Sequence, residues 1–120
     1  MMRQNISSGS AWEPKLGYSR AVKVGPYIHV AGTTGPGADA ATQTRAALET
    51  IKGALEKAGA GMQDVVRTRL FVTDISQWEA IGKVHGEYFG DIRPAMAMVQ
   101  VVKLIDPSLF VEIEADAYVG

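Results

Sequence analysis

Two carboxylates near the end of the chain have a spacing that could do chemistry. The run LFVEIEADAYV, residues 109–119, alternates apolar and polar side chains, which predicts a strand with one buried face. Glu112 and Glu114 then share the opposite face. Carboxylates in a cleft that raises their pKa serve as general acids or bases. The same spacing also fits a solvated or arginine-paired strand face, and the alternation alone leaves both interpretations open.

The other reactive residue types form no comparable pattern. The chain has no cysteine, which excludes a thiol nucleophile, a disulfide scaffold and a Cys-based zinc site. The two histidines, His29 and His85, lack a metal-ligand spacing such as HExxH, and His85 is expected to pack at a helix edge. The stretch AGTTGPG, residues 31–37, lacks the lysine of a phosphate-binding loop. We therefore expect no metal and no cofactor.

The elements that must position Glu112 follow from periodicity. Strands are predicted at residues 18–24, 27–33, 64–74, 93–104 and 109–119, and amphipathic helices at 40–58 and 76–89. Residues 1–17 show no period and are expected to form a loop. The order β-β-α-β-α-β-β predicts one α+β domain over residues 1–120, with a single β-sheet covered by two helices on one face.

Local signals mark the ends of both predicted helices. Asp39 or Thr42 is the expected N-cap of the first, and Gly59 follows its last turn. Ser76 and Glu79 have the spacing of a capping box at the start of the second. Gly53 is expected to cost the first helix about 1 kcal/mol relative to alanine unless close packing needs the missing side chain.

The stretch RPAMAMVQVVKL, residues 93–104, combines a strand pattern with two methionines. Alternation predicts Met96 and Met98 on the sheet face opposite the helices. That face is also expected to carry Arg67, Arg69, Phe71, Gln100, Val102, Glu112, Glu114 and Asp116. Its apolar members need cover, and the sequence contains no third layer. We therefore expect a homo-oligomer, with clefts between subunits as small-ligand sites.

Composition narrows the class of partner. The 120 residues are 47% hydrophobic and 21% charged, with a formal charge of −1, as in an ordinary water-soluble domain. No basic surplus favours nucleic acid, and no polybasic run or long apolar stretch favours a membrane. The segment MMRQNISSGS, residues 1–10, has no apolar run typical of a signal peptide. The cytoplasm is the expected compartment.

Nearly the whole chain, from about Tyr18 to Val119, resembles the RidA family, also called YjgF or L-PSP endoribonuclease. The resemblance is carried by LGYSRAVKVGPYIHVAGTTG, by the long run from QTRAALETIKGALEKAG through DVVRTRLFVTD to RPA, and by VEIEADAYV. It implies a chorismate-mutase-like α+β fold. It also implies a homotrimer whose sheets line a central barrel, with ligand sites in three clefts between subunits.

The resemblance also implies a site and a reaction. Enzymes of the family hydrolyse reactive enamines and imines to a 2-oxo acid and ammonia, with a carboxylate placing or activating water. By position, Glu112 matches that carboxylate, Tyr18 the pocket tyrosine, and Ala31 and Gly32 a backbone clamp. Met98 occupies a small or thiol-bearing position of the family's pocket.

One position departs from the family pattern. An arginine in a PAR motif should hold the substrate carboxylate, but the sequence reads Pro94-Ala95-Met96. A thioether cannot pair with a carboxylate, so hydrolysis of 2-imino acids is not expected. Arg93, three residues before Met96, is expected on the opposite strand face, which makes it a poor substitute unless the turn at Pro94 redirects it. Trp12 and Glu13 could also reach the cleft, with no role assigned.

Three functions remain open. The chain could be a hydrolase of an enamine or imine that does not depend on a carboxylate, with Glu112 as general base. It could instead be a non-catalytic trimer that binds or senses a small molecule. The third, an endoribonuclease, rests on the family's older name, and the lack of a basic, aromatic stripe argues against it.

Overall fold

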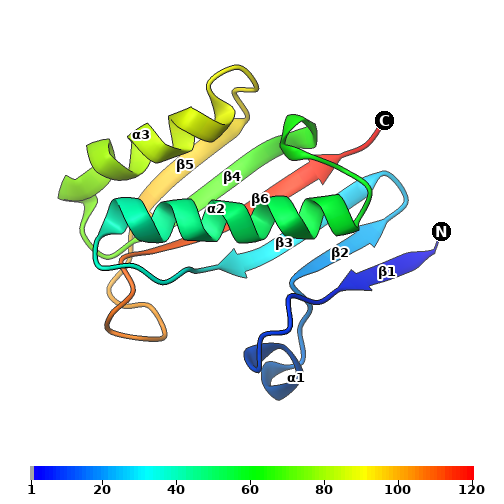
Figure 1. Ribbon diagram of the computed structural model, residues 1–120, viewed down its shortest axis with the longest axis horizontal. Helices are drawn as coiled ribbons and strands as arrows, with labels where there is room; N and C mark the ends of the chain where they lie inside the picture. Colours follow the sequence, from blue (N-terminus) through cyan, green and yellow to red (C-terminus); the bar gives the residue numbers. More distant parts are fainter. Residues whose placement is uncertain (1) are drawn as a thin grey trace.

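The computed structural model of the chain, which describes residues 2–120, is an α+β fold built on one six-stranded sheet. The strand order is β1-β2-β3-β6-β4-β5, and helices α2 and α3 lie on one face (Figure 1). The strands are β1 (Arg3–Ile6), β2 (Ala21–Val24), β3 (Tyr27–Thr33), β4 (Val65–Val72), β5 (Ala95–Gln100) and β6 (Val111–Tyr118). The helices are α1 (Trp12–Leu16), α2 (Ala40–Lys57) and α3 (Trp78–Phe89), with short 3-10 turns at Met62–Asp64 and Ile75–Gln77. The predicted fold class is confirmed.

The expectation of a loop over residues 1–17 was wrong. β1 pairs antiparallel with β2 and adds an edge strand, and α1 forms one short helix that ends at Gly17, whose φ is 78°. In β1 only Ile6 is buried, so the strand has no alternation to read. A helix of five residues is likewise too short to show a 3.6-residue period. β1 forms through its pairing with β2, and neither β1 nor α1 has a sequence pattern that predicts it.

α2 follows its sequence signals. The Asp39 carboxylate accepts a hydrogen bond from the Thr42 backbone N–H at 2.8 Å, and Gly59 follows the helix with a φ of 81°. The apolar side of α2, centred on Leu48, Ile51 and Leu55, is fully buried against the sheet. The predicted N-cap and C-terminal glycine are confirmed, and the helix is fixed where it crosses β3 and β6.

The capping box predicted at the second helix was wrong. The Asp74 carboxylate accepts hydrogen bonds from the Ser76 backbone N–H at 3.0 Å and from the Ser76 hydroxyl at 2.6 Å. This contact builds the 3-10 turn Ile75–Gln77, and α3 begins after it, at Trp78. Ser76 is thus engaged by Asp74, two residues before it, rather than acting as a cap.

β4 departs from strict alternation at its start. The register between β4 and β6 shifts between Val65 and Arg67, which marks a β-bulge. Val65 is therefore buried, while Val66 is 53% exposed, although alternation with Arg67 and Arg69 predicts Val65 on the face opposite the helices. From Thr68 onward the alternation is as predicted, with Thr68, Leu70 and Val72 buried.

β5 pairs with β4 in parallel, and this register corrects the predicted face of both methionines. Met96 is the neighbour of Thr68, and Met98 of Leu70, both of which point toward the helices. Paired residues of neighbouring strands project from the same face of a sheet. Met96 and Met98 therefore lie on the helix-covered side, where Met98 packs against the core. The prediction of the opposite face was wrong because β5 carries apolar side chains on both faces, so its alternation does not decide which face is covered; the parallel register with β4 does.

Two glycines predict opposite effects on stability. A Cβ on Gly35 would lie 2.4 Å from the Ala46 Cβ and 2.8 Å from the Ala47 backbone N, whereas one on Gly53 would meet nothing within 4 Å. We expect Gly35→Ala to lower the free energy of unfolding by about 1–3 kcal/mol, because α2 must move. Gly53→Ala should raise it by about 1 kcal/mol. Urea unfolding at one protein concentration tests both, and a Gly35→Ala protein as stable as the parent would contradict the packing.

Candidate functional site

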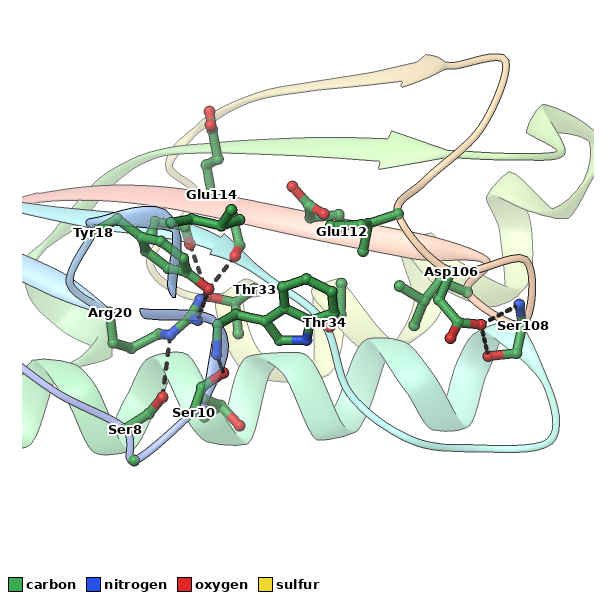
Figure 2. A pocket seen from close by; sticks show the side chains of 18 residues that line it. Ser8, Ser10, Tyr18, Arg20, Thr33, Thr34, Asp106, Ser108, Glu112 and Glu114 are labelled. Carbon is green, nitrogen blue, oxygen red and sulfur yellow. Dashed lines mark hydrogen bonds between the residues drawn. The ribbon is translucent and has the colours of Figure 1, made fainter. Parts of the chain in front are cut away.

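A cleft of about 970 Å³ opens at the end of β3, beside α1, β6 and the loop between β5 and β6. Figure 2 shows Tyr18 and Arg20 at one end of the cleft and Asp106 and Ser108 at the other, with Glu112 between them. Residues from both ends of the chain thus meet in one hollow.

A break in strand pairing creates the floor of the cleft. The register of β3 against β6 shifts between Val30 and Thr33, at Ala31 and Gly32. The Ala31 N–H donates to the Arg20 carbonyl at 2.9 Å. Glu112 on β6 packs directly over Gly32, because a Cβ there would lie 2.2 Å from its Oε2. Glycine at position 32 is therefore what allows the Glu112 carboxylate to lie in the cleft.

Glu112 differs from the other carboxylates of its strand. Glu114 and Asp116 both approach Arg69, with Nη1–O distances of 3.7 Å and 3.1 Å. Glu112 is paired with Phe71 on the neighbouring strand β4. It takes part in no ion pair among the described residues 2–120. The two interpretations of the sequence thus divide between neighbours: Glu114 is arginine-paired, and Glu112 is not.

The surroundings of Glu112 shift its titration. Burial raises the pKa of Glu112 above its ordinary value, and the charge of Glu114 raises it further, while the Arg20 guanidinium opposes both. A carboxylate with a raised pKa, lying in a cleft, is a stronger base toward water than an ordinary glutamate. Glu112 therefore has the electrostatics of a general base.

A buried ion pair supports the other end of the cleft. Arg20 and Glu13 are 6% and 4% exposed, and Arg20 Nε lies 3.9 Å from Glu13 Oε2. The Ser8 hydroxyl donates to Glu13 Oε2 at 2.6 Å and accepts from Arg20 Nε at 3.4 Å. Arg20 also donates to the Tyr18 hydroxyl at 3.1 Å. The N-terminal segment is tied to the sheet through this cluster.

The predicted site residues fall into two groups. Tyr18, Ala31, Gly32 and Glu112 line the same cleft. Met96 and Met98 are not among its lining residues in the single chain, because β5 lies at the far edge of the sheet. Trp12 lines the cleft, and Glu13 reaches it through Arg20.

Sequence reasoning missed Arg20. A signal was present, since an arginine two residues after Tyr18 shares its face in an alternating strand. No sequence pattern, however, predicts that Ser8 and Glu13 bury that arginine.

No group of three or more His, Asp or Glu side chains within residues 2–120 could hold a metal ion. His85 is buried and places Nε2 2.9 Å from the Thr68 hydroxyl, as expected of a packed histidine. None of the helices in this part of the chain has the length and apolar character to cross a membrane.

Fold and cleft together define a class: a small α+β domain whose carboxylate-bearing cleft lies at the end of β3, beside β6. The chain belongs to the endoribonuclease L-PSP family, whose profile matches residues 8–119.

Known proteins support this assignment. A crystal structure of Rv2704 from Mycobacterium tuberculosis, described as a member of the YjgF/YER057c/UK114 family, superposes with a TM-score of 0.97 at 59% identity and covers 98% of this chain and 100% of that one. A RutC family protein of Pyrococcus abyssi is 36% identical over 98% of both chains. The 3-aminoacrylate deaminase RutC of Acinetobacter baylyi is 44% identical over 68% of this chain and 64% of its own length.

Proposed function

We propose that this protein hydrolyses a small uncharged imine or enamine to a carbonyl compound and ammonia, with Glu112 as general base. The observation that carries the proposal is the Glu112 carboxylate, which is partly buried, free of an arginine and placed over Gly32 in the cleft. A relative that covers two thirds of this chain is named as a deaminase of 3-aminoacrylate, an enamine. Family membership and the state of Glu112 therefore favour the same reaction class.

The reaction needs no group beyond water and these side chains. An enamine first becomes its imine tautomer as carbon gains a proton and nitrogen loses one. Glu112 then accepts a proton from water as the water oxygen bonds to the imine carbon, and passes it to nitrogen to give a neutral carbinolamine. Glu112 next takes the proton of the carbinolamine hydroxyl and gives it to nitrogen as the carbon–nitrogen bond breaks, which leaves a carbonyl and releases ammonia. The Tyr18 hydroxyl lies in the same cleft and can donate a hydrogen bond to the substrate.

A homotrimer is part of the proposal. The sheet face opposite the helices carries Val99, Tyr27 and Tyr118 at 47%, 51% and 45% exposure, and monomers rarely leave such patches uncovered. In a closed trimer, β5 of a second copy would approach the cleft of the first copy. Met96, 44% exposed on that edge, would then form an apolar wall opposite Glu112. This arrangement supports small substrates without a carboxylate.

Ammonia release tests the proposal. The protein is assayed against imines generated in situ, with and without a carboxylate, beside a buffer blank. We expect release above the blank from uncharged imines and little from 2-iminopropanoate. No release from any member of the panel would reject the hydrolase and leave a binding protein.

One observation favours that second candidate, a non-catalytic binder. Met96 stands where the family resemblance implies the substrate-binding arginine, and an enzyme that lost its anchor could keep the cleft alone. A binder predicts that a ligand raises the melting temperature while no product forms.

The pH profile follows from the neighbours of Glu112. A general base works ionised, so kcat/KM should rise with pH through the pKa of Glu112, above the usual ~4.3 of a glutamate. Because the charge of Glu114 raises that pKa, Glu114→Gln should move the rise to lower pH. Asp116→Asn, farther along the same strand, is the control. An equal shift in both variants would contradict a specific effect of Glu114.

A further inference from the structure

The charges around the cleft are unequal. Among the described residues that line it, Arg20 is the one cation, while Asp106, Glu112 and Glu114 are acidic. A cleft for a carboxylate would need an accessible cation to offset these three side chains. Whether Arg20 is free to pair with a ligand carboxylate therefore decides which ligands the cleft accepts.

Most donors of Arg20 are already engaged within the protein. Nη1 donates to the Gly32 carbonyl at 2.8 Å and to the Thr33 hydroxyl at 2.9 Å. Nε faces the Ser8 hydroxyl and the Glu13 carboxylate. The two-pronged edge that an arginine offers to a carboxylate is thus divided among protein acceptors.

Glu13 also neutralises the charge of Arg20. Burial tends to raise the pKa of Glu13, but hydrogen bonds from Ser8 and the charge of Arg20 outweigh this, and the pKa lies below its ordinary value. Glu13 is therefore ionised at neutral pH. Its anchor is double, because the Ser8 backbone N–H donates at 3.1 Å beside the Ser8 hydroxyl.

Arg20 orients the Tyr18 hydroxyl group. Arg20 Nη2 donates to the Tyr18 oxygen at 3.1 Å, so that oxygen is an acceptor toward Arg20 and its own hydrogen points elsewhere. Tyr18 lines the cleft and can donate to a neutral acceptor, such as a carbonyl oxygen or an imine nitrogen.

We infer that Glu13 and Arg20 form a specificity-determining pair, in which Glu13 neutralises Arg20 and Arg20 orients Tyr18, so that the cleft selects a neutral ligand over a carboxylate. This inference rests on the proposed function in one respect, that the cleft is the ligand site. It does not depend on turnover.

The test compares two probes of nearly equal size, pyruvamide and pyruvate, by NMR titration of backbone amides around Gly32. We expect the parent protein to bind pyruvamide and to bind pyruvate at least about tenfold more weakly. In Glu13→Gln, which keeps an acceptor for Ser8, pyruvate should bind roughly 10- to 100-fold more tightly, the range of a charge-assisted contact. Arg20→Gln in that background should remove the gain.

Matched variants separate the explanations. Glu114→Gln removes one negative charge from the same cleft without touching the pair, and an equal gain there would overturn the inference. Ser8→Ala loosens Glu13 by a second route and should give a smaller gain, which keeps the test valid if Glu13→Gln folds poorly.

The variant Met96→Arg separates failure of this inference from failure of the proposed cleft between subunits. If Met96→Arg gains pyruvate and Glu13→Gln does not, the inference fails alone. If neither variant gains it, the cleft between subunits fails as well. A parent protein that binds pyruvate as tightly as pyruvamide, or that does not bind pyruvamide, also overturns the inference.

Discussion

Replacing Glu112 by glutamine is expected to lower kcat/KM for ammonia release by about 10²- to 10⁴-fold, the usual contribution of a positioned general base. Glutamine keeps the size of the side chain over Gly32 but cannot accept the proton of the attacking water. The measurement is initial rate against an uncharged imine that the parent protein hydrolyses. A Glu112→Gln protein with full activity would remove Glu112 from the mechanism.

Gly32→Ala reaches the same side chain by another route. A methyl group at position 32 would lie 2.2 Å from Glu112 Oε2 and 2.9 Å from its Cδ, so the flexible end of Glu112 must swing away. We expect a folded protein with a loss of activity in the same direction as Glu112→Gln. Asp116→Asn, which lies outside the cleft on the same strand, controls for the loss of a carboxylate from β6. Activity retained in Gly32→Ala would show that the position of Glu112 over Gly32 does not matter.

Met96→Arg is expected to produce the second large effect, a gain. An arginine at this position on β5 of a neighbouring copy would supply a two-pronged partner for a substrate carboxylate. Such a contact contributes about 1.5–3 kcal/mol, so kcat/KM for 2-iminopropanoate should rise by roughly 10- to 100-fold. The measurement is ammonia release from 2-iminopropanoate beside an uncharged imine.

Two substitutions at the same position control for size and charge. Met96→Leu keeps an apolar side chain and should give no gain, and Met96→Lys should give a smaller one, since an ammonium group is a point charge without the planar fork. If the parent protein already hydrolyses 2-iminopropanoate as well as the Met96→Arg variant, the methionine does not limit the substrate. If the arginine variant gains nothing, β5 of a second copy does not wall the cleft.

Features with a local repeat were predicted from the sequence, whereas features that depend on strand pairing were not. The buried face of β6 and the capped helix α2 were predicted because strands repeat every two residues and helices every 3.6, and both repeats are local. The bulge at Val65 and Val66 was not predicted, since an extra residue in a strand shows itself only against its partner. The predicted face of Met96 and Met98 failed because apolar residues occupy both faces of β5, and only the pairing of β5 with β4 decides between them.

The sequence by itself determined the fold class, the family, and the face of β6 on which Glu112 lies, because each depends on periodicity or on runs of neighbouring residues. Tertiary structure decided which carboxylate stands free, which face β5 presents, and that Glu13 and Ser8 enclose Arg20. Glu112 and Gly32 lie 80 positions apart, and only the pairing of β3 with β6 brings them together. Contacts between distant segments depend on strand register and chain closure, which leave no local period to read.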